Sequence, residues 1–136
     1  MLTYSVSAKR LDAHGSEART KEARLTLDTD LAGRLDAFNP AELFLASIAA
    51  CILKGIERVT PLLGFELAGV DVQLNGVRQD SPPRMISVTY EIVVETSETD
   101  QRLELLHKNV RKFGTISNTV AEAANLSGSI RRKQTA

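Results

Sequence analysis

The sequence predicts an α+β fold, because strand patterns and helix patterns occupy separate stretches of the chain. Segments of alternating apolar and polar residues come first, followed by one long apolar helix, two further strands and two helices. No internal repeat or linker interrupts this order, and 136 residues suit one domain better than two. We therefore expect a single domain over residues 1–136 and not a doubly wound parallel sheet.

The first third of the chain has the pattern of antiparallel strands. Leu2, Tyr4, Val6 and Ala8 alternate with polar residues, which is the period of a half-buried strand. The same alternation recurs over 23–27. Two strands are predicted from these stretches.

A helix is predicted from about residue 40 to 60. Asn39 is suited to the N-cap, Pro40 to the first helical position, and Glu42 to the return bond of a capping box. The apolar residues of this segment surround the helix axis instead of forming one stripe, which predicts a helix buried on most sides. They are Leu43, Phe44, Leu45, Ile48, Ile52, Leu53 and Ile56.

Two strands, over 70–74 and 86–94, follow the helix and again show alternation. Between them the stretch 79–83 is favoured as the turn over Asn75-Gly76, because Ser81-Pro82-Pro83 has no place in a central strand.

The helical period returns from Asp100 and ends at Gly114. A shorter helix containing Val120 and Ala123 and a closing strand over 127–132 are expected after it. The basic residues 131–133 are interpreted as a solvated terminus and not as a binding arm.

Composition excludes several classes of function. Hydrophobic residues make up 43% of the chain and charged residues 25%, as in ordinary globular proteins. Lys plus Arg and Asp plus Glu number 17 each, so little electrostatic attraction to nucleic acid or anionic lipid is expected. The apolar stretch 43–53 is shorter than the roughly 20 residues that span a bilayer. We expect no nucleic-acid partner and no membrane span.

The usual motifs for nucleotide, serine-hydrolase and zinc chemistry are missing from the sequence, so no cofactor or metal is predicted. His14 and His107 are far apart and have no partner at ligand spacing. His107 is interpreted as a packing or surface residue.

Cys51 is the only cysteine, and it cannot form a disulfide within the chain. Together with an N-terminus that lacks a secretory pattern, this predicts a cytoplasmic location. A thiol in an apolar helix is often a small packing residue. Cys51 also lies three turns into its helix, beyond the reach of the helix dipole, so activation would have to come from another segment or subunit.

Residues 39–51, which read NPAELFLASIAAC, resemble the signature helix of the OsmC/Ohr family, the osmotically inducible and organic hydroperoxide resistance proteins. The likeness continues at Arg24-Leu25-Thr26-Leu27-Asp28 and Gly33 upstream. Downstream, Ile116-Ser117-Asn118-Thr119 is similar to the end of the family's second motif, C-P-[VI]-S-x-T.

The resemblance implies an intertwined homodimer in which antiparallel sheets from both subunits wrap long central helices, with active sites at the subunit interface. It also implies thiol chemistry. The thiolate of Cys51 attacks the O–O bond of an organic hydroperoxide, and the resulting sulfenic acid is captured by a second cysteine. Dithiols of the lipoyl type then restore the thiol.

This chain departs from the family pattern at its second motif and at its helix start. The second cysteine and the following proline are replaced by Gly114 and Thr115, so an internal resolving thiol is missing. The acidic residue expected directly after Asn-Pro is Ala41, while Glu42 stands one place later. On an ideal helix Glu42 and Cys51 lie on opposite sides, which favours the capping role for Glu42.

The family also places an arginine from the N-terminal strands beside the thiolate. Arg10, Arg19 and Arg24 are the candidates, and no motif selects one of them.

Two functional hypotheses follow. In the first, the chain is a peroxidase in which Cys51 is the catalytic nucleophile and an external thiol reductant resolves the sulfenic acid. In the second, the chain is a non-catalytic homodimer that binds a small lipophilic ligand at the subunit interface, with Cys51 as a packing residue. A structural or interaction protein ranks third.

Overall fold

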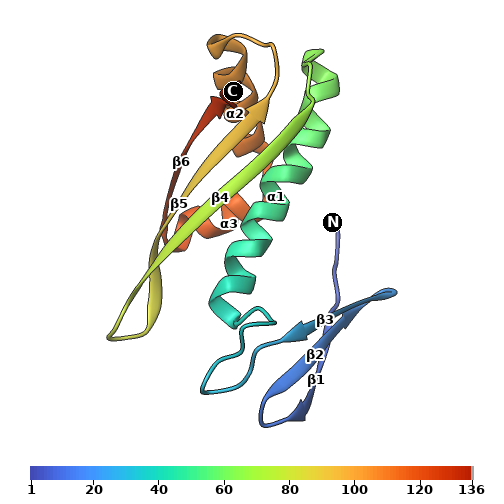
Figure 1. Ribbon diagram of the computed structural model, residues 1–136, viewed down its shortest axis with the longest axis vertical. Helices are drawn as coiled ribbons and strands as arrows, with labels where there is room; N and C mark the ends of the chain where they lie inside the picture. The colour runs from blue at the N-terminus through green and yellow to red at the C-terminus, as the bar shows by residue number, and fades with distance from the viewer. Residues whose placement is uncertain (136) are drawn as a thin grey trace. The chain divides into compact units, whose positions relative to one another are not determined.

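The computed structural model describes residues 1–135 and divides the chain into two compact units, Met1–Phe44 and Leu45–Ala136. Figure 1 shows the order of the elements, with three strands first, then a long helix, two strands, two helices and a final strand. The alternation of strand and helix groups confirms the predicted α+β class.

The first unit holds a three-stranded antiparallel sheet in the order β1-β2-β3. The strands are β1 (Ser7–Asp12), β2 (Gly15–Thr20) and β3 (Ala23–Leu27). The strand predicted from the pattern at Leu2–Ala8 is displaced, because β1 begins at Ser7 and Leu2 and Tyr4 are 83% and 81% exposed.

Asp28 organises the loop between β3 and the first helix. Its carboxylate accepts hydrogen bonds from the backbone N–H groups of Asp30, at 3.1 Å, and Arg34, at 2.9 Å. Its own N–H donates to the Phe38 carbonyl, and its side chain is buried. A buried carboxylate satisfied by backbone donors in this way holds the loop in one conformation.

Helix α1 (Pro40–Leu63) begins with the predicted capping box. The Asn39 side chain accepts from Glu42 N–H at 2.8 Å, and the Glu42 carboxylate accepts from Asn39 N–H at 3.0 Å. The expectation of burial on most sides is wrong for the single chain, because the fully buried side chains lie on one face and Leu53 and Leu62 are 40% and 80% exposed. Among the described residues, no helix combines the length and apolarity that crossing a membrane requires.

The second unit is built on the sheet β4-β5-β6, with strands β4 (Gly69–Gln79), β5 (Arg84–Glu95) and β6 (Asn125–Arg132). The β4–β5 hairpin turns between Gln79 and Arg84, as predicted, and Asn75-Gly76 lies within β4. β6 pairs with β5 in parallel, so the sheet is mixed and the expectation of purely antiparallel sheets is wrong here. Parallel pairing follows from the two helices that carry the chain back along the sheet.

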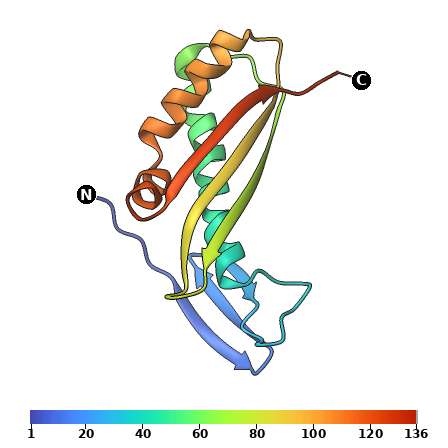
Figure 2. The same ribbon diagram turned by 90° about the vertical axis from the view of Figure 1, so that its left-hand side faces the viewer.

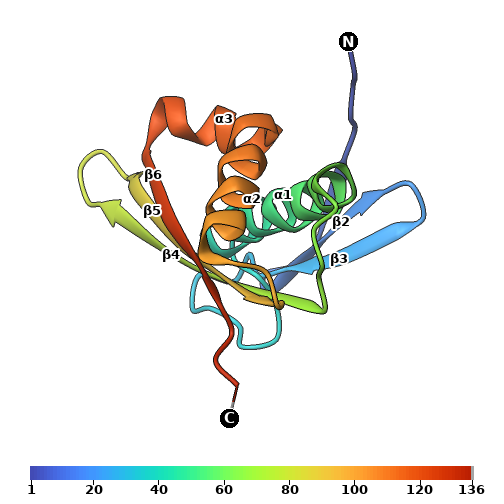
Figure 3. The ribbon, with the colours of Figure 1, turned by 90° about the horizontal axis from the view of Figure 1, so that it is seen from above.

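Helices α2 (Asp100–Phe113) and α3 (Thr115–Ala123) connect β5 to β6. Figure 2 shows the sheet of the second unit from the side, and Figure 3 shows α1 and α2 on the same face of it. Helices α1 and α2 approach each other closely at Gly55, where an added Cβ would lie 3.2 Å from Val110 Cγ1. The core between helices and sheet is formed by Ile48, Ile52, Ile56, Val88, Ile92, Val94, Leu103, Leu106 and Val110.

The two basic residues at the end of β6 are not a free tail. Arg131 pairs with Glu91 of β5, and Arg132 pairs with Asp100 at the start of α2 at 2.7 Å. Both residues belong to β6, where Arg131 is exposed and Arg132 is half-buried, and Lys133 follows as an exposed residue.

Candidate functional site

Cys51 lies in the middle of α1, on the part of the helix that belongs to the second unit, and its thiol is a free, half-buried group. The Ser117 hydroxyl stands 4.0 Å from Sγ, within reach of a hydrogen bond to sulfur. Ser117 itself is 2% exposed. The buried hydroxyl is therefore placed to donate to the sulfur.

Gly114 brings the second motif to this thiol. It lies between α2 and α3, where it ends one helix and caps the next with an extended backbone, φ −79° and ψ 111°. A Cβ built on Gly114 would lie 3.2 Å from Cys51 Sγ and 3.2 Å from Ser117 Oγ. Residues 51, 114 and 117 therefore form one cluster, although strands β4 and β5 and helix α2 lie between Cys51 and Gly114 in sequence.

Residue 114 is in the position that a cysteine disulfide-bonded to Cys51 would take. An S–S bond of about 2.05 Å places each sulfur roughly 3 Å from the opposite Cβ, and the separation here is 3.2 Å. The φ of −79° lies in the range open to any residue, so no backbone requirement explains the glycine. The replaced second cysteine is thus located in space as well as in sequence.

The other residues considered from the sequence have local roles. Glu42 is engaged in the capping box, as expected, and Ala41 precedes it as an exposed residue. Arg10, Arg19 and Arg24 lie on β1, β2 and β3 and are exposed within the first unit. Arg19 forms an ion pair with Glu17, which lowers the pKa of the Glu17 carboxyl.

His14 is part of the hairpin between β1 and β2 and lies 2.8 Å from the Asp30 carboxylate. This hydrogen bond and the charge of Asp30 raise the pKa of His14 above its ordinary value of 6.5. The imidazole is a partner of the Asp30 loop in the first unit.

A polar cluster that the sequence did not reveal joins β5 to α2. The Tyr90 hydroxyl lies 2.6 Å from His107 Nε2 and accepts a hydrogen bond from Arg111 Nη1 at 3.1 Å. Burial lowers the pKa of His107 below 6.5, and the charge of Arg111 lowers it further, while Glu104 acts in the opposite direction. The signal in the sequence was a tyrosine at a buried strand position, which needs a partner for its hydroxyl.

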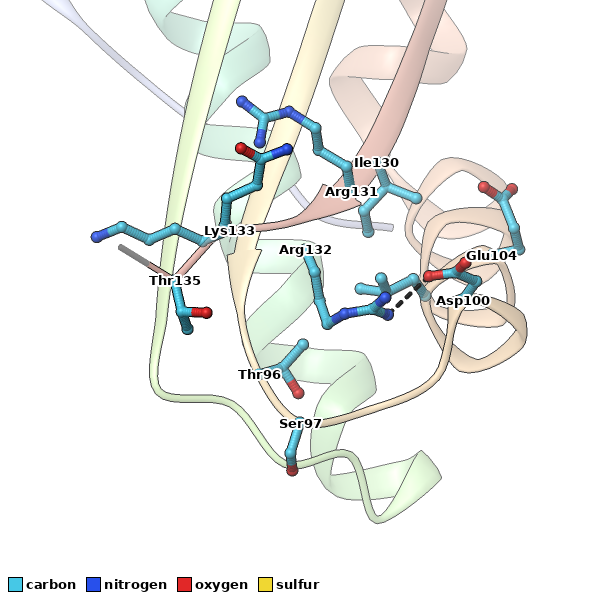
Figure 4. Close-up of a pocket in the computed structure, with 11 residues that line it drawn as sticks. Thr96, Ser97, Asp100, Glu104, Ile130, Arg131, Arg132, Lys133 and Thr135 are labelled. Carbon is cyan, nitrogen blue, oxygen red and sulfur yellow. Dashed lines mark ion pairs between the residues drawn. The ribbon is translucent and has the colours of Figure 1, made fainter.

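A separate groove of about 880 Å³ lies where β6 meets the start of α2 (Figure 4). The ion pair between Arg132 and Asp100 lies within it, and Arg132 Nη1 also donates to the Glu98 carbonyl at 2.9 Å. Cys51 does not line this groove. Two of the cations that line it, Arg131 and Arg132, are already paired with carboxylates.

The fold is α+β, and its long helix α1 carries a half-buried thiol. The turn at Gly114, between α2 and α3, lies against this thiol. These features define a class of thiol-bearing proteins. The sequence model of the OsmC-like protein family matches residues 32–127, which include both Cys51 and Ser117. The chain belongs to the OsmC-like family. No curated protein matches the sequence significantly.

Solved structures share this fold at low sequence identity. An OsmC-like protein from Mycoplasma pneumoniae superposes with a TM-score of 0.84 at 16% identity, covering 97% of this chain and 96% of that one. The organic hydroperoxide resistance protein OsmC of Legionella pneumophila gives 0.75 at 22% identity, with coverages of 96% and 98%. The organic hydroperoxide resistance protein OhrB of Bacillus subtilis gives 0.67 at 18% identity, also with 96% and 98%.

Proposed function

We propose that this protein is a thiol-dependent organic hydroperoxide reductase in which Cys51 is the nucleophile. The observation that carries the proposal is the contact of Gly114 and Ser117 with Cys51 Sγ. The two sequence motifs that mark the family's redox site meet at one sulfur atom. Names of structural relatives such as the Legionella and Bacillus proteins support hydroperoxides as the substrate class.

The proposed first step is attack by the Cys51 thiolate on the outer oxygen of R–O–OH. The O–O bond breaks, sulfur is oxidised to the sulfenic acid, and the alkoxide leaves as the alcohol R–OH after taking a proton. The Ser117 hydroxyl supports this step by donating toward sulfur, which is 4.0 Å away. A half-buried position also limits access of other oxidants to the sulfenic acid.

Resolution of the sulfenic acid requires a thiol from outside the chain, because the sequence contains one cysteine. An external thiol would attack the sulfenic sulfur to give a mixed disulfide and water, and a second thiolate would then release Cys51 as a thiol. A dithiol of the lipoyl type supplies both sulfurs in one molecule, so its second attack is intramolecular and fast.

The proposed active form is a homodimer. Within one chain α1 leaves Leu53 and Leu62 exposed, at 40% and 80%, on a helix whose sequence predicts burial on most sides. A second copy of the chain would cover these side chains and could bring a cation to Cys51.

Peroxide consumption tests the proposal. The wild-type protein with dihydrolipoamide should reduce cumene hydroperoxide in repeated turnovers, and Cys51→Ser should abolish the reaction. Without reductant, one equivalent of peroxide should convert the thiol to a sulfenic acid that dimedone traps and mass spectrometry detects.

A second variant, Ser117→Ala, keeps the thiol and removes the nearby hydroxyl. Its rate of sulfenic acid formation should fall by roughly 5-fold to 10-fold, which corresponds to about 1–1.4 kcal/mol, within the net value of a typical hydrogen bond. A folded protein whose thiol neither consumes peroxide nor reacts with dimedone would contradict the proposal and leave the non-catalytic ligand-binding hypothesis.

A further inference from the structure

A small groove on the second unit has a different chemistry from the thiol site. It has a volume of about 380 Å³ and is lined by Tyr90 of β5, by four residues of α2 and by 126–128 of β6. The four residues of α2 are Glu104, His107, Lys108 and Arg111. We call it the α2–β6 groove. Cys51, Gly114 and Ser117 do not line it.

Arg111 is held firmly in this groove by neutral groups alone. Its Nη1 donates to the Tyr90 hydroxyl at 3.1 Å and to the Leu126 carbonyl at 3.3 Å. The guanidinium also lies 5.8 Å from the centre of the Tyr90 ring, in the range of a cation–π contact. Gly128 permits this packing, because a Cβ there would lie within 2.4 Å of three ring atoms.

The half-buried Arg111 lacks a carboxylate partner, which sets it apart from comparable arginines of this chain. Arg34, Arg102 and Arg132 are also partly covered, and each pairs with an Asp or Glu within 4 Å. No ion pair among residues 1–135 includes Arg111 or Lys108. A partly desolvated guanidinium is most stable beside an anion, and its fork geometry suits carboxylate and phosphate oxygens.

His107 adds a donor to the same groove. The Tyr90 hydroxyl oxygen accepts a hydrogen bond from Arg111. The hydroxyl proton of Tyr90 is therefore directed to Nε2 of His107, the other hydrogen-bond partner of this hydroxyl. In a neutral imidazole the ring proton is then on Nδ1, which makes no hydrogen bond within the described chain. Nδ1–H is therefore a donor that no acceptor among the described residues uses.

We propose that the α2–β6 groove binds the carboxylate or phosphate group of a small molecule. Arg111 is the anchor, Lys108 supplies a second positive charge, and His107 Nδ1–H supplies a third donor. Glu104 lines both this groove and the larger one of Figure 4, so it lies at the border between them. Its charge disfavours a ligand with a second anionic group on that side.

Calorimetric titration of the full-length protein with acetate and with inorganic phosphate tests the site. At low ionic strength at least one anion should bind, and the preferred one identifies the ligand class. Arg111→Met should weaken binding about tenfold or more, the value of a charge-assisted hydrogen bond. Lys108→Met should weaken it roughly 2-fold to 5-fold, as expected for an exposed charge.

Lys112→Met is the matched control, because Lys112 is on the same helix but lies over the Phe113 ring outside the groove. Its affinity should stay within about twofold of wild type. An NMR titration gives a second measure, since a bound anion favours the imidazolium and should raise the pKa of His107. This measurement and Lys108→Met keep the test valid if Arg111→Met does not fold. Absence of binding at millimolar anion, or equal weakening by all three variants, would overturn the proposal.

Discussion

At the scale of single residues, Gly114 stands where the second motif of the OsmC/Ohr pattern has a cysteine. Gly114 is buried and its φ of −79° is ordinary, and a Cβ at this position would lie beside Cys51 Sγ. A cysteine could therefore occupy this position with the same backbone conformation, and the glycine differs from it by lacking the thiol. The proposed catalysis by Cys51 therefore needs a thiol from outside the chain.

Gly114→Cys should restore an internal disulfide. Because the new Cβ would lie 3.2 Å from Cys51 Sγ, addition of peroxide should yield an intrasubunit disulfide seen as faster migration on a non-reducing gel. Oxidation should raise the free energy of unfolding by about 2–4 kcal/mol relative to the reduced variant.

Thr115→Cys is the control for this variant, because residue 115 is exposed and adjacent in sequence. It should remain reduced or form only intermolecular disulfides. If Gly114→Cys folds and does not cross-link, the assignment of residue 114 as the second motif position is wrong.

The proximity of residues 51 and 114 could be predicted from the sequence, because both lie in motifs whose spacing is retained in this chain. Sequence reasoning did not find the Tyr90–His107–Arg111 cluster. His107 and Arg111 follow Tyr90 by 17 and 21 positions in sequence. Only the packing of α2 on β5 brings the three side chains together. From the sequence alone His107 is interpreted as an ordinary packing residue. The structure shows that its Nε2 lies beside the Tyr90 hydroxyl.

At the scale of elements, the start of α1 is determined locally and its end is determined by tertiary contacts. The capping box needs only residues three apart, so it could be predicted from sequence. At the other end, Arg102 of α2 donates to the Leu63 carbonyl at 2.7 Å and pairs with Glu98. Backbone donation from Glu66, with the charge of Arg102, lowers the pKa of Glu98.

Arg102→Met should destabilise the protein by about 1–2 kcal/mol, since it leaves the Leu63 carbonyl and Glu98 without their charged partner. Urea unfolding followed by circular dichroism measures the change. Lys54→Met, on the exposed side of α1, is the control and should stay within about 0.5 kcal/mol of wild type. Equal losses in both variants would rule out a specific role for Arg102 at the end of α1.

The strands predicted over 23–27 and 86–94 are confirmed by β3 and β5, and the strand predicted at the N-terminus is displaced, since β1 begins at Ser7. Leu2, Tyr4 and Val6 alternate as regularly as the residues of β5, yet all three are exposed. The direction of β6 also escaped prediction, because alternation specifies which residues share a face but not whether neighbouring strands run parallel.

At the scale of the whole molecule, the proposed homodimer should have twice the 14.8 kDa mass of the chain in light scattering. Leu53→Glu should shift the equilibrium toward the monomer, because it would bury an unpaired charge in the interface. Leu105→Glu is a matched control, since Leu105 on α2 is 39% exposed and Leu53 is 40% exposed. A wild-type protein that stays monomeric at micromolar concentration would contradict the dimer.

The parallel pairing of β6 with β5 also bears on how the second unit folds. The β4–β5 hairpin joins neighbouring segments, and its contacts can form early. β6 reaches its place only after the intervening chain from Thr96 to Ala124 has closed a long loop, which costs entropy before any strand contact is gained. We therefore expect the hairpin to form first and the docking of β6 to be the slower step that completes the sheet. Until then one edge of β5 is open to strands of other molecules, so this strand is where aggregation would begin during refolding.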